Sequence, residues 1–250
     1  MVVFRSCLGD YRTRNECGWR FHGVTHVKDH TWPTVPAGTG RMLIVPLGSI
    51  EQHGPHLPLD TDGVIALALA TEIHESRTQA DLTPLIPLAA SGEHSGFAGT
   101  LSIGTDAMFL MLIELVRDAE RNWDSVLLVN GHGGNASALK SAISTARSEG
   151  RRVAVTGIFA DHGDAHAGRT ETSLMLFLDP ERVVQESYEV GNPASLTELL
   201  PLITSSGVRA VSHNGILGDP RGASAAEGEA IFKSSVQRAL AVCDALDSAH

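Results

Sequence analysis

The chain has 250 residues and a mass of 26.5 kDa, and 42% of its residues are hydrophobic. This is enough for one large domain or two small ones with a buried core, and it excludes fibrous and disordered classes. Nineteen Lys and Arg against 29 Asp and Glu give a net charge of −10. We therefore expect neither nucleic acid nor an anionic membrane surface as a partner.

The cysteine content and the longest apolar stretch indicate the compartment. The three cysteines form no C-x-x-C pair and favour a reducing environment over a disulfide framework: Cys7, Cys17 and Cys243. The longest apolar stretch, residues 64–70, is far shorter than the roughly 20 residues of a membrane span. The N-terminal arginines are not followed by the apolar segment of a signal peptide. We expect a cytoplasmic protein that does not cross a membrane.

The first 41 residues differ from the rest of the chain. They carry six basic and three acidic side chains, and prolines and glycines interrupt any periodicity. We predict a loosely ordered N-terminal arm over 1–41 and a single domain over 42–250. The three histidines of the arm are weak candidates for metal ligands: His22, His26 and His30.

The first predicted strand, residues 42–46, is a short apolar run that ends at a proline, as is typical of a buried parallel strand. A helix is expected over 61–76 with Thr61 or Asp62 as its N-cap, and a second strand over 82–88 despite two prolines. The remaining elements are a helix over 106–121, a strand over 125–129, a helix over 136–148, a strand over 152–159, and helices over 171–178 and 227–246. This alternation predicts an α/β fold with a mainly parallel sheet.

Histidine is the unusual entry in the composition, with 12 residues. Several histidines stand with carboxylates and glycines in short segments that directly follow predicted strands, at 51–56, 131–134 and 161–166. Because sites form at the carboxyl ends of parallel strands, we expect these three segments to converge on one edge of the sheet. Histidine together with Asp and Glu in loops is what a metal site or an acid–base site requires.

Individual residues in these segments have alternative roles. Glu51 and His53 are two apart in a segment that prolines hold out of helix, so both side chains can face one ion. Asp60 and Asp62 repeat this spacing, where a carboxylate either bridges two metals or caps the next helix. His132 lies in a glycine-rich turn that is either a metal site or an anion-binding nest.

Four further residues are candidates for the chemistry. His166 and Glu171 can reach one cavity, His166 as a proton shuttle and Glu171 as a ligand. The alternative for Glu171 is a structural role, in which its negative charge near the start of a helix interacts favourably with the helix dipole. Glu93, a second catalytic candidate, and its neighbour His94 either line a substrate pocket, support the ligands, or form a structural loop pair. His56 and His162 are expected to be structural or to support the ligands, with contact to the substrate as the alternative. Asn135 is expected to cap its helix, and Trp123 to lie in the core.

Four common signatures are missing. There is no H-E-x-x-H, no G-x-S-x-G, and no G-x-G-x-x-G or P-loop. Thermolysin-like peptidases, serine hydrolases of the elbow type and nucleotide-binding enzymes are therefore not indicated.

The run over 45–62, Val-Pro-Leu-Gly-Ser-Ile-Glu-Gln-His-Gly-Pro-His-Leu-Pro-Leu-Asp-Thr-Asp, resembles the signature of the creatininase family of metal-dependent amidohydrolases. The same family pattern recurs in Asn-Gly-His-Gly-Gly-Asn at 130–135 and in His-Ala-Gly-Arg-Thr-Glu-Thr-Ser at 166–173. The resemblance covers about residues 42–245. It implies a three-layer α/β/α fold with a mainly parallel sheet that assembles as a homo-oligomer, commonly a hexamer.

The resemblance also implies a metal centre with two divalent ions per subunit. By position, its ligands are Glu51, Asp62 and His132 for one ion and His53, Asp62 and Glu171 for the other, with Asp62 as the bridge. His166 then stands beside the scissile bond and protonates the leaving amine. Such mixed histidine and carboxylate donors suit Zn, Fe(II) or Mn.

One position departs from the family pattern. Creatininases that act on creatinine have a glutamate two residues after the histidine matched by His132, and this chain has Gly134 there. A carboxylate that contacts the metal centre is thus missing. This argues against creatinine as the substrate and weakens the ion site assigned to Glu51.

Within the family, three segments are most similar to the mycofactocin-system branch of peptidases: 91–104, 163–176 and 214–220. This implies a modified precursor peptide as the substrate, from which a water activated by two metal ions releases the C-terminal Val-Tyr-derived fragment. One alternative is an amidohydrolase with the same ligands that acts on a small cyclic amide or a formamide. The other is a binding protein that has kept the fold and lost the chemistry.

Overall fold

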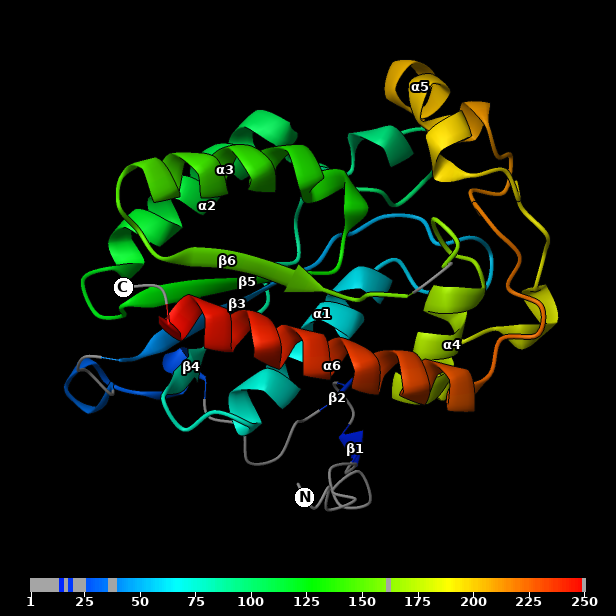
Figure 1. Ribbon diagram of the computed structural model, residues 1–250. Helices are drawn as coiled ribbons and strands as arrows, with labels where there is room; N and C mark the ends of the chain where they lie inside the picture. Colours follow the sequence, from blue (N-terminus) through cyan, green and yellow to red (C-terminus); the bar gives the residue numbers. More distant parts are fainter. Residues whose placement is uncertain (1–13, 16–17, 20–25, 36–39, 161–162, 249–250) are drawn as a thin grey trace.

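The computed structural model describes residues 14–15, 18–19, 26–35, 40–160 and 163–248. Its centre is a parallel sheet with the strand order β4-β3-β5-β6, shown in Figure 1. The four strands are β3 (Met42–Leu47), β4 (Ala80–Leu82), β5 (Ser125–Asn130) and β6 (Val153–Gly157). β3 and β5 pair over six residues, from Met42 with Ser125 to Leu47 with Asn130. Their carboxyl ends therefore lie side by side.

Alternating side chains of the two central strands enter two separate cores. Leu43 of β3 and Leu128 of β5 face the core under α2 (Thr105–Ala119) and α3 (Ala136–Ser148). Ile44 and Leu127 face the opposite core, which is closed by α1 (Thr61–Glu75), α4 (Arg169–Leu178) and α6 (Ala225–Ser248). Figure 1 shows the two helix layers on either side of the sheet. The predicted three-layer α/β/α fold is confirmed.

Most predicted elements are confirmed, and their ends shift by one or two residues. The strand expected over 82–88 is wrong in extent, because β4 ends at Leu82. Pro84 and Pro87 lack the amide hydrogen that a sheet ladder needs, so the pairing beyond Leu82 is interrupted. It continues at separate points, including the bonds from the Thr83 N–H to the Ile44 carbonyl and from the Ile86 N–H to the Pro46 carbonyl, both at 3.0 Å. The N-cap position of α1 belongs to Asp60, not to Thr61 or Asp62.

The sequence did not indicate α5 (Leu196–Ser206), which lies beyond the sheet at the top of Figure 1. Ser195 and Glu198 form a capping box at its start, and Pro201 lies inside it. Shorter 3-10 turns are Val27–Asp29, Trp32–Thr34, Gly92–His94, Gly133–Asn135, Pro180–Arg182, Gln185–Ser187 and Val208–Ala210. None of the helices in the described ranges combines the length and apolarity needed to span a bilayer.

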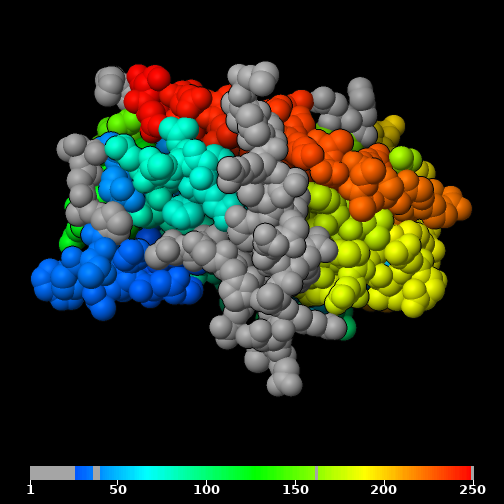
Figure 2. Space-filling model, turned by 90° about the horizontal axis from the view of Figure 1, so that it is seen from below, coloured from blue at the N-terminus to red at the C-terminus, as the bar shows by residue number. Residues whose placement is uncertain are grey.

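Part of the predicted N-terminal arm is described. β1 (Arg14–Asn15) and β2 (Gly18–Trp19) pair as a small antiparallel ladder. Residues 26–35 (blue) lie at the opposite end of the molecule from residues 180–195 (yellow) in Figure 2. The His26 ring contacts the Thr83 carbonyl at 3.2 Å, and neither His26 nor His30 belongs to a group of metal-type donors among the described residues. Cys7, Cys17 and His22 lie outside the described residues, and Cys243 is buried as a free thiol.

The central strands are the most sensitive part of the fold. Leu127 is fully buried in β5, whereas Leu110 of α2 is 57% exposed. We expect Leu127→Ala to lower the free energy of unfolding by about 2–5 kcal/mol, because a cavity remains in a close-packed core. Leu110→Ala should change it by less than about 0.5 kcal/mol. Urea denaturation of both variants measures this, and equal effects would contradict the layer assignment.

Candidate metal centre

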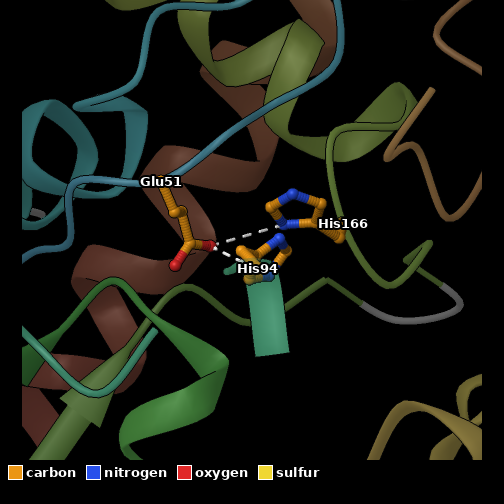
Figure 3. A group of neighbouring side chains, drawn as sticks. All are labelled: Glu51, His94 and His166. Carbon is orange, nitrogen blue, oxygen red and sulfur yellow. Dashed lines mark ion pairs between the residues drawn. The ribbon is translucent and has the colours of Figure 1, made fainter. Parts of the chain in front are cut away.

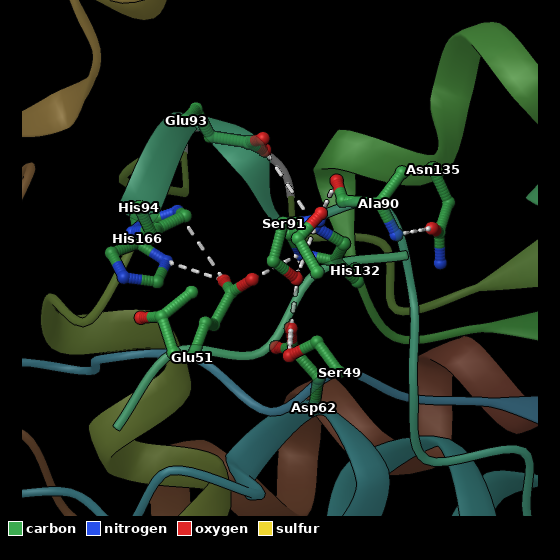
Figure 4. Close-up of polar contacts among 12 residues, drawn as sticks. Ser49, Glu51, Asp62, Ala90, Ser91, Glu93, His94, His132, Asn135 and His166 are labelled. Carbon is green, nitrogen blue, oxygen red and sulfur yellow. Dashed lines mark hydrogen bonds and ion pairs between the residues drawn. The ribbon is translucent and has the colours of Figure 1, made fainter. Parts of the chain in front are cut away.

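The histidine-rich segments meet where the strands end, as predicted. Glu51 and His53 follow β3, and His132 follows β5. The chain beyond β6 brings His166 to the same place, where its Nδ1 lies 3.8 Å from Glu51 Oε1. Figure 4 shows side chains from these separate loops pointing toward one another.

The first group of donors comprises Glu51, Asp62 and His132, and all three side chains are buried. His132 Nδ1 lies 3.1 Å from Glu51 Oε2 and 3.1 Å from Asp62 Oδ2. The Ser49 hydroxyl donates a hydrogen bond of 2.7 Å to the same Asp62 oxygen. One imidazole nitrogen thus faces two carboxylates, and Ser49 fixes the position of the Asp62 carboxylate.

The second group surrounds His53. Its Nε2 lies 3.1 Å from Asp62 Oδ1 and 3.9 Å from Glu171 Oε2. The ring of His166 lies 4.5 Å from the His53 ring, centroid to centroid. Asp62 therefore has one oxygen in each group, and a carboxylate in this position can be shared between two cations.

A third group joins Glu51 to His94 and His166, as Figure 3 shows. His94 Nε2 lies 3.4 Å from Glu51 Oε1. Both carboxylate oxygens of Glu51 are buried without a hydrogen-bond partner among the described residues. A buried carboxylate of this kind is costly unless cations surround it, so the donor set fits divalent metal ions.

The electrostatics divide the histidines into two kinds. Burial alone would lower the pKa of His53, but the carboxylates of Asp62, Glu171 and Glu51 together outweigh burial and raise that pKa to about 10. Burial lowers the pKa of His94 to about 4 and that of His166 to about 3. Burial also raises the pKa of Glu171 to about 7. The protonated ring thus faces Asp62, and the rings of His94 and His166 are neutral at neutral pH.

Gly134 and Glu93 occupy neighbouring positions. A Cβ built on Gly134 would lie 2.1 Å from Glu93 Oε1, 2.4 Å from His132 Nε2 and 2.5 Å from the Ala90 carbonyl oxygen. Glu93 Oε1 itself is 3.6 Å from His132 Nε2. Burial raises the pKa of the Glu93 carboxyl. The space beside Gly134 is thus filled by a carboxylate from another loop.

Several other candidates are placed away from the cluster. The Asp60 carboxylate binds Arg182, whose Nη1 donates to Oδ2 at 3.2 Å. The His56 ring contacts the Thr172 hydroxyl at 2.9 Å, and the Trp123 ring packs against a core while its N–H donates to Asp81. His162 lies outside the described residues.

Asn135 differs from its expected role as a helix cap. Within the described structure its side chain makes no capping hydrogen bond. Its Oδ1 accepts from the Ala90 amide at 3.2 Å, and its Nδ2 donates to Asn130 Oδ1 at 3.0 Å. Asn135 therefore ties the loop of Glu93 to the end of β5.

Sequence reasoning missed Gln52. It is 5% exposed, and its side chain contacts the rings of both His94 and His166. Its position in the sequence between two predicted ligands, Glu51 and His53, could have indicated that it lies at the site.

Comparisons with known proteins agree on one family. The family model described as Creatininase, creatinine amidohydrolase, matches residues 28–243. A mycofactocin precursor peptide peptidase of Mycolicibacterium smegmatis is 49% identical over 200 residues, covering 78% of this chain and 81% of that protein. One of Mycobacterium ulcerans is 47% identical over 214 residues, covering 82% of each. The solved structure "Creatininase Mn" has a TM-score of 0.74 at 24% identity over 89% of this chain and 99% of that chain, which supports the fold.

The crowding at Gly134 generates a test with a neighbouring control. No described atom lies within 4 Å of a Cβ built on Gly133, in contrast to Gly134. We expect Gly134→Ala to lower the affinity for zinc by about tenfold to a hundredfold, because the methyl group displaces the far side of the His132 ring. Gly133→Ala should bind zinc like the unaltered protein. Chelator competition measures both affinities, and equal values would contradict the crowding.

Proposed function

Because the chain belongs to the creatininase family and is a hydrolase of amide or peptide bonds, we propose that it is a peptidase of the mycofactocin precursor peptide. In this proposal it cleaves the C-terminal Val-Tyr-derived fragment from the modified peptide. The buried Glu51 carboxylate, which faces imidazoles and lacks a hydrogen-bond partner among the described residues, is the observation that carries the metal-dependent part. The substrate is supported by the two mycobacterial precursor peptide peptidases, which are 47% and 49% identical to this chain.

We propose two divalent ions per subunit, either Zn, Fe(II) or Mn. The first ion would be held by Glu51, Asp62 and His132, and the second by His53, Asp62 and Glu171, with Asp62 shared. These oxygen and imidazole donors include no thiolate that would restrict the choice of metal. Bound ions of this kind supply Lewis acidity, which activates a water molecule and polarises the substrate carbonyl.

His166 handles the proton in this proposal. Its ring is neutral at neutral pH because burial lowers its pKa to about 3, so one ring nitrogen is bare and can accept the proton that the attacking water gives up. It then gives this proton to the amine that leaves the substrate, because an amide nitrogen departs as a neutral amine. Glu93, whose side chain is 25% exposed beside His132, lines the side of the centre from which substrate approaches.

Three further features belong to this proposal. Residues 42–250 form the hydrolase domain, and 1–41 precede it as an arm. The active form is a homo-oligomer, and it works in the cytoplasm.

Product analysis by mass spectrometry tests the substrate. Metal-loaded protein is incubated with a mycofactocin-type precursor peptide that is modified at its C-terminal Val-Tyr, and His53→Ala serves as the control. We expect release of the C-terminal fragment by the unaltered protein alone. An intact peptide, together with hydrolysis of creatinine or a formamide, would replace the peptide with a small amide as the substrate. A metal-loaded protein inert to every amide would favour a binding protein.

The roles of the residues are separable by metal content and turnover. We expect His53→Ala and Glu171→Ala to lose metal, since each removes a donor. His166→Ala should keep its metal and lose about a hundredfold to ten-thousandfold in turnover, the usual range for a proton-transfer group. The exposed His213 provides the control His213→Ala, which should behave like the unaltered protein. Near-normal turnover of His166→Ala would exclude the assigned role.

A further inference from the structure

We propose that Gln52 is a positioning residue that fixes the tautomers of His94 and His166, so that each ring turns a defined nitrogen toward Glu51. The tautomers are inferred from hydrogen bonds, and their effect on turnover rests on the proposed function. The Gln52 side chain is 5% exposed and belongs to none of the three donor groups. Its carboxamide nitrogen contacts His94 Nδ1 at 2.9 Å, His166 Nε2 at 3.0 Å and the Gly215 carbonyl at 3.0 Å.

The neighbours of Gln52 determine the orientation of its amide. The Gly54 N–H donates to Oε1 at 2.8 Å, and Nε2 donates to the Gly215 carbonyl at 3.0 Å. A flipped amide would place an oxygen against the Gly215 carbonyl and an NH₂ group against the Gly54 N–H. Both contacts would be repulsive, so only one orientation is possible.

This orientation assigns the proton of His94. The second N–H of the Gln52 amide points to His94 Nδ1, which must therefore be the bare, accepting nitrogen. The ring proton of His94 then sits on Nε2, 3.4 Å from Glu51 Oε1. His94 consequently presents an N–H to this carboxylate.

His166 is assigned by the main chain of the same residue. Its Nε2 lies 2.8 Å from the Gln52 carbonyl oxygen, which can only accept, so Nε2 carries a proton. Both N–H groups of the Gln52 amide are already used, and the 3.0 Å approach of the amide to His166 Nε2 is a packing contact. Nδ1, at 3.8 Å from Glu51 Oε1, is then the nitrogen through which His166 exchanges a proton.

The segment around Gly215 supports both partners. Gly215 has φ +83°, and a Cβ there would lie 1.9 Å from Gln52 Oε1, so only glycine leaves room for the carboxamide. Two residues further on, the Leu217 N–H donates to the His166 carbonyl at 2.9 Å. The rings of His94 and His166 lie 4.5 Å apart beside the amide. Gln52 thus links the two rings to the segment that holds the backbone of His166.

The consequence concerns proton transfer, not metal binding. Without the amide, His94 can exchange tautomers and turn a bare nitrogen toward Glu51. The His166 ring keeps its bond to the main-chain carbonyl but loses the amide against which it packs, so its Nδ1 can turn away from Glu51. Gln52→Met keeps the length of the side chain and removes its hydrogen bonds. We expect full metal content, KM within about threefold and kcat at least about tenfold lower, because the proton-transfer group is misdirected. The exposed Gln185 gives the matched control, Gln185→Met.

Histidine ¹⁵N–¹H correlation spectra test the geometry without turnover. In the metal-free unaltered protein we expect His94 and His166 as Nε2–H tautomers, assigned with the variants His94→Ala and His166→Ala. Gln52→Met should change the tautomer pattern of His94 and leave the Nε2–H of His166, which the main-chain carbonyl of residue 52 holds. Gly215→Ala, which crowds the amide from the other side, should do the same. An Nδ1–H tautomer at His94 in the unaltered protein would overturn the proposal, as would a Gln52→Met variant with unchanged spectra and kcat.

These spectra also separate the two proposals. If the precursor peptide is not cleaved, the tautomers of the unaltered protein still confirm or overturn the positioning role, and kcat is measured on whichever amide is hydrolysed. If the peptide is cleaved and the tautomers differ from those expected, the positioning role fails and the proposed function stands.

Discussion

The burial of two adjacent carboxylates, Glu51 and Asp62, is the constraint on which the rest of the site depends. They are 0% and 2% exposed at the end of the sheet, where two negative charges together are strongly unfavourable without compensation. His132 contacts both, and His53 contacts Asp62 from the other side. The parallel pairing of β3 with β5 places the loops that follow these strands side by side. The contacts between the carboxylates and His132 therefore depend on this pairing.

Much of this arrangement could be predicted from local sequence. The central strands are continuous apolar runs, which is what burial on both faces of a parallel sheet demands. Since the carboxyl ends of such strands share one edge, the meeting of Glu51, His132 and His166 followed from their positions after predicted strands. Spacing alone left the roles of Asp60 and Asp62 equivalent. Of the three groups of donors that the structure brings together, the resemblance implied the set of Glu51, Asp62 and His132, and it placed His166 and His94 in no group.

The remaining features depend on contacts between residues distant in sequence. Asp60 is held by Arg182, which no local pattern reveals. Alternation along an extended segment would turn Gln52 away from Glu51 and His53, yet its amide reaches the histidines because Gly54 and Gly215 bond to it. At position 134 the sequence has glycine where creatininases that act on creatinine have a glutamate. The space beside Gly134 is filled by the carboxylate of Glu93, which comes from the 92–94 turn of another loop.

The site thus divides into two parts with different supports. The carboxylates and His132 are fixed by β3, β5 and the start of α1, the rigid centre of the fold. His94 and His166 come from loops that Gln52 and the Leu217 segment hold in place. A change in the loops can alter which amide is admitted and how its proton is delivered while the donors stay where the sheet puts them. One metal-holding framework can therefore serve hydrolases of unlike amides, and the basis of substrate choice lies in the loops above the sheet.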